Sequence, residues 1–380
     1  MSSSTITGFK LSSQQRQVWQ RSSRLGHPQT IQCGLTLHGD LDVPRLQTAL
    51  QTIVNRYEIF RTTFQEMPGM TLPLQVIQEQ GCITWQRIDL SSDVAQAAVN
   101  AAHRDMERLK INTTGQPELR ALLFQQSEQN YTLLLTLLAL SADLPTCQIL
   151  LTQLGQAYDG TLLSDEEPVQ YAQFSTWQDQ LLTEPDEDTQ AAQAFWQQQD
   201  LLLHQPLSPP LGYRDVRQDK SSLQIHRVEI APHVANALLS MESAIETILL
   251  TGWLILLWRH TEQSEFTIGV VCDARQDEEL AEACGPFTHV LPLQSQFSDT
   301  TAFSALQRQI EQAWHNLSDW QDYVPLNQLN DLASLPISFE FVNQLGSVTS
   351  ARITFNLDYV VATRPSEERL VASQQGNRQE

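Results

Sequence analysis

Hydrophobic and polar positions along this chain predict helices and strands in mixed order. Apolar residues recur at helical spacing from Asp42 to Arg56, where Asp42 is a candidate N-cap and Pro44 falls in the first turn. Residues Thr30–His38 alternate between polar and apolar, as in a strand. Further helices are predicted at Ser12–Gln20, Val94–Leu109, Thr146–Tyr158, Ile245–His260 and Phe303–Leu317, and further strands at Pro73–Gln78, Thr84–Ile88, Leu119–Gln125, Ser221–Ile230, Glu265–Cys272, Ile337–Phe341 and Arg352–Tyr359.

The segment Tyr131–Leu140 is almost continuously apolar, which predicts a strand covered on both faces. Because strands and helices are mixed in both halves of the chain, we expect an α/β protein with two lobes. Composition shifts at Asp159–Pro168, where a glycine and an acidic run indicate a surface loop. We therefore expect one lobe at residues 1–165 and a second at residues 166–380.

The charge of the chain argues against one class of function. Its 380 residues include 44 acidic and 23 basic side chains, which give a formal net charge of −21. Nucleic-acid binding depends on clustered lysine and arginine, and the chain has no basic stripe. Nucleic acid is therefore not an expected partner.

The cysteines and the apolar segments indicate a reduced, cytoplasmic protein. The five cysteines are widely spaced and form no CxxC pair, and the histidines lack metal-ligand spacing, so neither a disulfide nor a metal site is expected. Cys147 begins a helix whose dipole could lower the thiol pKa, but its apolar neighbours favour a buried, inert thiol. The N-terminus has no apolar core of signal-peptide length, and Ile245–Trp258 is too short to span a bilayer, so no membrane association is expected.

Five short motifs occur in an order and spacing that match one protein family over nearly the whole chain. They are Ser12–Arg16 with Trp19, Arg56–Phe64, Tyr171–Trp177, Asp273 and Arg275 with Gly285–Leu293, and Gln321–Pro325. The chain resembles the condensation domains of nonribosomal peptide synthetases, which take part in secondary metabolite biosynthesis. This resemblance implies two chloramphenicol-acetyltransferase-like lobes in a V shape, with a central tunnel that two carrier-protein arms enter.

The resemblance also exposes a departure in the active-site loop. The family carries two histidines, three variable residues and Asp-Gly on this loop. Leu138 and Ala139 stand at the two histidine positions, Asp143 matches the aspartate, and Leu144 replaces the glycine. The second histidine is the family's proposed proton-handling group, and the methyl group of Ala139 cannot transfer a proton.

Two other side chains are candidates for a catalytic role. Ser141 would need an adjacent base to act as a nucleophile, and a loop serine more often caps the following helix. His289 replaces a usual asparagine near the lobe interface of the family, and the alternative is an ordinary core or surface histidine. For Asp143 we expect a structural ion pair with Arg61, as in the family, with a role as base as the alternative.

These residues leave several functions open. The favoured one is a degenerate condensation-type domain of a nonribosomal peptide assembly line that binds, gates or recruits carrier-bound intermediates or tailoring enzymes. The alternative is an active carrier-dependent acyltransferase that forms an amide or ester from a thioester without the usual histidine, since positioning alone can accelerate the reaction. A third is a stand-alone protein descended from the fold.

The partners follow from the favoured function. Carrier (thiolation) proteins or domains are the expected partners, with a tailoring enzyme as a further one. No bound cofactor is expected other than the phosphopantetheine arm that a partner carrier presents. The absence of adenylation and carrier motifs fits either a stand-alone chain or one domain of a longer protein.

Overall fold

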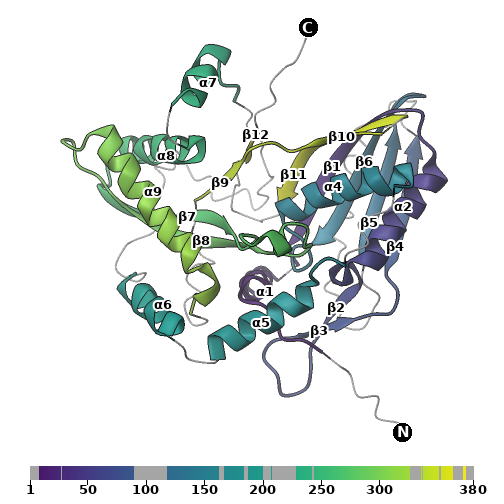
Figure 1. Ribbon diagram of the computed structural model, residues 1–380, viewed down its shortest axis with the longest axis horizontal. Coiled ribbons are helices and arrows are strands. Elements are labelled where there is room, and N and C mark those ends of the chain that lie inside the picture. The colour runs from purple at the N-terminus through teal and green to yellow at the C-terminus, as the bar shows by residue number, and fades with distance from the viewer. Residues whose placement is uncertain are drawn as a thin grey trace, which may run out of the picture. The chain divides into compact units, whose positions relative to one another are not determined.

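The chain folds into two compact units in the computed structural model, which describes residues 8–26, 28–89, 118–161, 167–183, 187–199, 207, 228–241, 244–325, 335, 337–350, 352–362 and 371–373 (Figure 1). Unit 1 comprises Met1–Thr183, Arg275–Phe287 and Leu345–Thr363. Unit 2 comprises Glu184–Ala274, Thr288–Gln344 and Arg364–Glu380. The expected single boundary at residue 165 does not describe this division, because two later segments return to unit 1.

Unit 1 contains a six-stranded sheet in the order β10-β11-β1-β6-β5-β4. Only β4 and β5 pair in parallel. The late strand β11 lies beside the early strand β1, and this pairing draws the segment Leu345–Thr363 into unit 1. The strands are β1 (Thr30–Gly39), β4 (Cys82–Asp89), β5 (Glu118–Gln125), β6 (Asn130–Leu138), β10 (Ser347–Thr349) and β11 (Ile353–Ala362).

The central strand β6 carries the apolar run noted in the sequence. Residues 133–137 are all buried, so the prediction of a strand covered on both faces is confirmed. Branched and apolar side chains favour this conformation because they pack well on a pleated, covered surface. The strand leads directly into the loop that carries Asp143.

Helices α2 (Val43–Arg56) and α4 (Leu144–Asp159) lie together on one face of this sheet (Figure 1). The predicted start of α2 is confirmed, because Asp42 accepts a hydrogen bond from the backbone N–H of Arg45 at 3.0 Å and Pro44 lies in the first turn. The apolar positions at helical spacing in α2 are all buried: Leu46, Leu50, Ile53 and Val54.

The remaining elements of unit 1 support the sheet. Helix α1 (Ser13–Leu25) begins with a capping box between Ser12 and Gln15 and lies beside α5 (Tyr171–Thr183). The hydroxyl group of Ser12 lies 2.7 Å from that of Tyr171. The 3₁₀ turn η1 (Glu58–Arg61) leads into the hairpin of β2 (Thr62–Gln65) and β3 (Leu74–Ile77).

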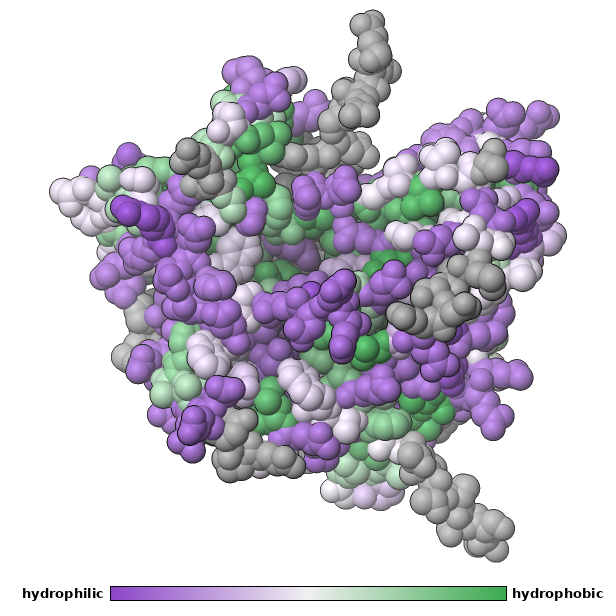
Figure 2. Space-filling view, viewed as in Figure 1, coloured by the Kyte–Doolittle hydropathy of each residue, from purple (hydrophilic) through white to green (hydrophobic). Residues whose placement is uncertain are grey.

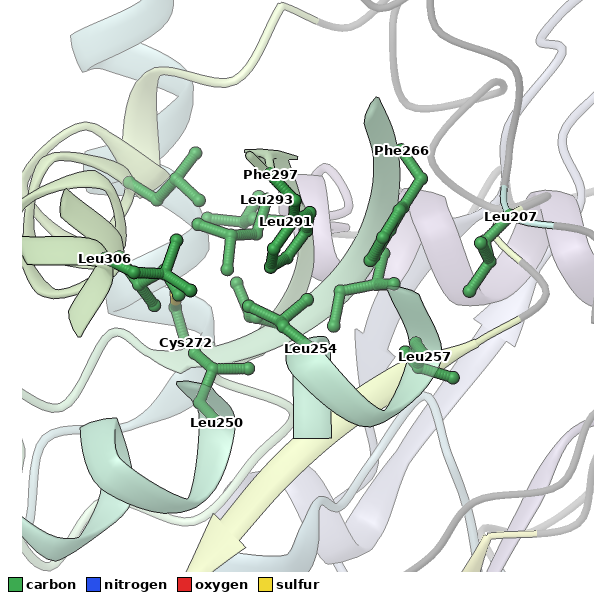
Figure 3. Packing of buried hydrophobic residues seen from close by; sticks show 14 of the residues in the cluster. Leu207, Leu250, Leu254, Leu257, Phe266, Cys272, Leu291, Leu293, Phe297 and Leu306 are labelled. Atoms are coloured by element: carbon green, nitrogen blue, oxygen red, sulfur yellow. The ribbon is translucent and has the colours of Figure 1, made fainter. Parts of the chain in front are cut away.

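Unit 2 is built on a four-stranded sheet in the order β12-β9-β7-β8. Leucines of α8 and α9 pack against apolar side chains of β7 and β8 in its core (Figure 3). The indole of Trp196 is fully buried and donates a hydrogen bond to the carbonyl of Trp320 at 3.0 Å. The elements are α6 (Glu187–Gln198), α7 (Pro232–Leu239), α8 (Ile245–Thr261), α9 (Phe303–Asp319), β7 (Glu265–Asp273), β8 (Thr288–Gln296), β9 (Ser338–Val342) and β12 (Val371–Ser373).

Most predicted elements agree with the structure to within a few residues, whereas the helices α5, α6 and α7 and the strands β2, β8, β10 and β12 were missed. The predicted helix Val94–Leu109 lies outside the described residues. So does most of the predicted strand Ser221–Ile230, whose last three residues are not in a strand. Among the described helices, none combines the length and the apolar character that crossing a bilayer requires.

The surface is mainly hydrophilic on the face shown in Figure 2, in keeping with the high net charge. Hydrophobic side chains interrupt it near α7, where every described helix residue is at least partly exposed. Scattered apolar side chains of this kind are common on folded proteins.

Candidate functional site

The loop that carries the family's motif positions, here called the motif loop (residues 138–144), joins β6 to α4 in unit 1. Its backbone is held from two directions. The N–H of Ala139 donates to the carbonyl of Gln29 at 2.9 Å, and the side-chain amide of Gln15 donates to the carbonyl of Leu140 at 3.0 Å. The loop is therefore a fixed part of unit 1.

Asp143 ends the loop and caps α4. Its carboxylate accepts hydrogen bonds from the backbone N–H of Thr146 at 2.9 Å and from the Thr146 hydroxyl at 2.6 Å. This cap starts the helix at Leu144, two residues before the predicted start. The expectation that Ser141 caps the helix is wrong, because Asp143 holds the N-cap position.

Arg275, not Arg61, is the ion-pair partner of Asp143. Its Nη1 lies 2.9 Å from Oδ2 of Asp143 and its Nη2 lies 2.9 Å from Oδ1, a bidentate arrangement. The two side chains are only 4% and 5% exposed. The predicted pair with Arg61 is therefore wrong: Arg61 bonds Glu58 at 3.2 Å and the carbonyl of Gln78 at 2.6 Å.

The segment 275–287, here called the Arg275 loop, wraps around this guanidinium. Arg275 also donates to the carbonyls of Ala283 and Gly285, both at 2.9 Å, and to the hydroxyl of Thr146 at 3.0 Å. Its guanidinium carbon lies 4.3 Å from the centre of the Phe287 ring. These contacts satisfy a buried charge that would otherwise be costly.

The last residue of the Arg275 loop, Phe287, also contacts Asp143. The backbone N–H of Phe287 donates to Oδ2 of Asp143 at 2.9 Å. The turn before it requires glycine, because Gly285 has a φ of +149° and a Cβ there would lie 2.0 Å from Cδ2 of Tyr171. The pair therefore ties the start of α4 to a segment 132 residues away.

The surroundings of Asp143 favour the structural interpretation over a role as base. Five hydrogen bonds from Thr146, Arg275 and Phe287 reach its two oxygens. A carboxylate offers about four lone-pair sites, so no site is left for a proton from a substrate.

Leu138 and Ala139, which the sequence leads us to expect at the family's two histidine positions, are both apolar. Leu138 packs with Val18 and Trp19 of α1 at the edge of a cluster whose buried members are Leu11, Phe64 and Leu140. Ala139 is half-buried. Neither position can exchange a proton.

Ser141 and His289 belong to different units of the structure. Ser141 is buried in the motif loop of unit 1, whereas His289 belongs to β8 of unit 2. His289 is fully buried and shares a strand face with Leu291 and Leu293, which belong to the core of unit 2. This placement favours the core interpretation of His289.

The surroundings of three buried thiols disfavour the thiolate, which is the reactive form of cysteine. A hydrogen bond with Cys33, together with burial, raises the pKa of the Cys147 thiol well above its usual value. Burial likewise raises the pKa of Cys284, and that of Cys272 to about 12. The buried, inert thiol predicted at Cys147 is therefore supported, and a pKa lowered by the helix dipole is not.

Comparison with known families decides the assignment. The family model described as "Condensation domain" matches residues 7–354. The chain belongs to the condensation domain family. The predicted family and the predicted α/β fold are thereby confirmed.

Relatives of this condensation domain are peptide synthetases. Tyrocidine synthase 2 of Brevibacillus parabrevis is 25% identical over 307 residues, which cover 80% of this chain and 8% of the relative. Cyclosporin synthetase simA of Tolypocladium inflatum is 26% identical over 314 residues, which cover 78% of this chain and 2% of the relative. The chain thus spans a small part of the length of the curated relatives that it matches.

Solved structures of this condensation fold are also similar. The condensation domain from the monacolin K polyketide synthase MokA has a TM-score of 0.75 and 21% identity, and the match covers 97% of this chain and 89% of that one. The X-domain from teicoplanin biosynthesis has a TM-score of 0.68 and 20% identity, covering 97% and 85%. Another solved structure contains the X-domain in complex with OxyB.

Proposed function

We propose that this condensation domain acts in a nonribosomal peptide assembly line by binding carrier-bound intermediates and recruiting a tailoring enzyme, without proton transfer from the motif loop. The observation that carries the proposal is the motif loop itself. Leu138 and Ala139 stand where the family has histidines, and the only carboxylate of the loop, Asp143, is saturated with hydrogen bonds.

The chemistry of amide formation supports this proposal. The attacking amine must lose a proton, and a base that takes it must lie within hydrogen-bond reach and titrate near neutral pH. A general base typically contributes about a hundredfold to ten-thousandfold in rate. Ser141, the remaining polar side chain of the loop, would itself need a base to be activated.

Recruitment is supported by the likeness to a fold that binds another protein. The X-domain of teicoplanin biosynthesis has been solved in complex with OxyB, and its match covers 98% of this chain. We propose that the present domain likewise holds a tailoring enzyme near a carrier-bound intermediate. Its partners are then carrier domains with their phosphopantetheine arms, and its setting is the cytoplasm.

One observation is compatible with the alternative of an active acyltransferase. The buried network of Asp143, Arg275 and Phe287 that fixes the motif loop is complete. A fixed loop could still align a thioester and an amine, and alignment alone can accelerate their reaction. A binding domain needs the same rigid loop, so the network does not separate the two functions.

An acyl-transfer assay with intact-mass detection separates them. Candidate donor and acceptor carriers are loaded with aminoacyl-phosphopantetheine and mixed with the unmodified chain, and carrier binding is measured in parallel. The proposal predicts carrier binding without acyl transfer. Acyl transfer by the unmodified chain above the carrier-only background would overturn it in favour of the acyltransferase.

Two variants sharpen the result. Ala139→His restores the missing imidazole, and Gln126→His places one on the exposed turn after β5 as a matched control. Transfer by Ala139→His alone would mean that the site lacks only its base. Transfer by neither, with carrier binding intact, is the result expected of a domain that acts by binding.

A further inference from the structure

One buried amide beside the motif loop has a hydrogen-bond donor that no group in the described residues accepts. Gln29 precedes β1 and is only 5% exposed. Its backbone is fully engaged, because the N–H donates to the hydroxyl of Ser22 at 3.2 Å and the carbonyl accepts from the N–H of Ala139 at 2.9 Å. Its side-chain Nε2 is buried without a partner among the described residues. A buried, unpaired donor destabilises the fold, so such groups call for an explanation.

The strand register places this amide next to Ala139. Strands β1 and β6 are antiparallel, with Thr30 opposite Leu138. The hydrogen bond from Ala139 to Gln29 continues this ladder by one residue, so these two residues lie opposite each other. Opposed residues of antiparallel strands project from the same face, with Cβ atoms about 5 Å apart.

A second glutamine, within β1, shows what such a pair does when an acceptor is present. Gln32 lies opposite Thr136, and its Nε2 donates to the Thr136 hydroxyl at 3.1 Å. Gln32 is 6% exposed, nearly as buried as Gln29. Ala139, the residue opposite Gln29, offers only a methyl group. The difference between the two pairs is the missing acceptor.

We propose that Gln29 is a ligand-recognition residue, whose buried amide donates a hydrogen bond to a carbonyl oxygen of an acyl or peptidyl group bound beside Ala139. The inference rests on the proposed binding of carrier-bound intermediates, which carry thioester and amide carbonyls. A neutral acceptor fits best, because a single neutral N–H donor could not repay the desolvation of a phosphate or carboxylate. Ala139 is half-buried, so part of its surface can contact a ligand, and the Gln29 amide, which is itself buried, would turn toward a carbonyl bound there.

The test uses a stable probe, an acyl-aminopantetheine in which an amide replaces the thioester, with unacylated pantetheine as the control probe. Affinity is measured by calorimetry for the unmodified chain and for Gln29→Met, which keeps the side-chain length and removes the donor. We expect Gln29→Met to bind the acylated probe about five- to tenfold more weakly, the change produced by one hydrogen bond of about 1–1.4 kcal/mol. The melting temperature of the free variant should not fall, because the donor has no partner to lose.

Two further variants distinguish ligand recognition from a structural role. In Gln32→Met the Thr136 hydroxyl loses its donor, so the melting temperature should fall while probe affinity stays unchanged. Ala139→Thr copies the residue opposite Gln32 and offers Gln29 an internal acceptor, so it should weaken probe binding. The side-chain amide resonance of Gln29, identified by its loss in Gln29→Met, should shift when the acylated probe is added.

The outcomes separate this inference from the proposed function. Equal probe affinity for the unmodified chain and Gln29→Met would overturn the role of Gln29, and so would a marked loss of stability in Gln29→Met. Failure of the unmodified chain to bind the probe would overturn it as well. The proposed function is then judged by carrier binding and acyl transfer, which do not depend on this probe.

Discussion

Replacing Asp143 with alanine tests the buried network around the motif loop. The substitution removes a carboxylate that accepts hydrogen bonds from Thr146, Arg275 and Phe287. Arg275 keeps its bonds to the carbonyls of Ala283 and Gly285, but its charge loses its counter-ion at a position where the side chain is 4% exposed.

The expected loss of stability follows from these contacts. Removing one partner of a buried ion pair costs about 3–5 kcal/mol, because the other charge remains buried. Loss of an N-cap carboxylate costs a further ~1 kcal/mol. Since the two effects share atoms, they should not add fully, and we expect a decrease in the free energy of unfolding of about 4 kcal/mol.

The assay is urea unfolding, with the free energy extrapolated to zero denaturant. Asp143→Ala is combined with Arg275→Met in one double-mutant cycle and with Arg61→Met in another. The first cycle should give a coupling energy of about 3 kcal/mol, because the double variant no longer buries an unpaired charge. The second should give a coupling energy near zero, because Arg61 pairs with Glu58 at 3.2 Å instead.

Two results would refute this reasoning. A loss of stability below about 1 kcal/mol for Asp143→Ala would mean that the pair behaves like an exposed salt bridge. A coupling energy to Arg61 larger than that to Arg275 would restore the partner expected from the sequence.

Two further predictions concern the same unit and the buried thiols. In thermal melts, Gly285→Ala should destabilise the fold by about 3 kcal/mol, because the added Cβ would lie 2.0 Å from the Tyr171 ring and φ at this residue is +149°. The control Gly252→Ala in α8, where no atom lies within 4 Å of the added Cβ, should be neutral or stabilising. The pKa values of Cys272 and Cys284 are raised in the folded state, so the folded protein keeps these protons above about pH 8.5, where the unfolded chain loses them. The contribution of the two thiols to the free energy of unfolding is therefore present below that pH. Above it, this contribution falls by about 1.4 kcal/mol per thiol for each pH unit. Urea unfolding near neutral pH and at about pH 10 should show this decrease in stability. The variant Cys284→Ala should lose less stability between the two pH values than the unmodified chain. A free energy of unfolding that rises with pH over this range would contradict the prediction.

Local elements could be predicted from the sequence wherever one segment carries its own signal. Helix α2 is specified by its cap, its first-turn proline and its apolar spacing, all of which act within one stretch of chain. Strand β8 was missed because Pro292 and His289 interrupt its apolar run, and its strand character depends on pairing with β7. Helices α5 and α6 were missed because polar and aromatic residues blur their apolar periodicity.

The candidate site divides in the same way. The structural role of Asp143 could be inferred from the order of motifs, and the same order led to the expectation that Leu138 and Ala139 replace the family's histidines. The partner of Asp143 could not, although Arg275 lies within one of the quoted motifs. Gln29 carried no sequence signal at all, because its unpaired donor is visible only once its neighbour across the strands is known.

The sequence by itself determined the family and the main local elements, because periodicity, caps and short motifs act between residues near one another in the chain. Only the tertiary structure decided that β11 joins the sheet of unit 1, that Arg275 rather than Arg61 neutralises Asp143, and that His289 lies in a core. The physical reason is that these outcomes depend on contacts between distant segments. Arg275 and Asp143 are 132 residues apart, and two arginines are equally able to pair with one carboxylate until the fold brings one of them beside it.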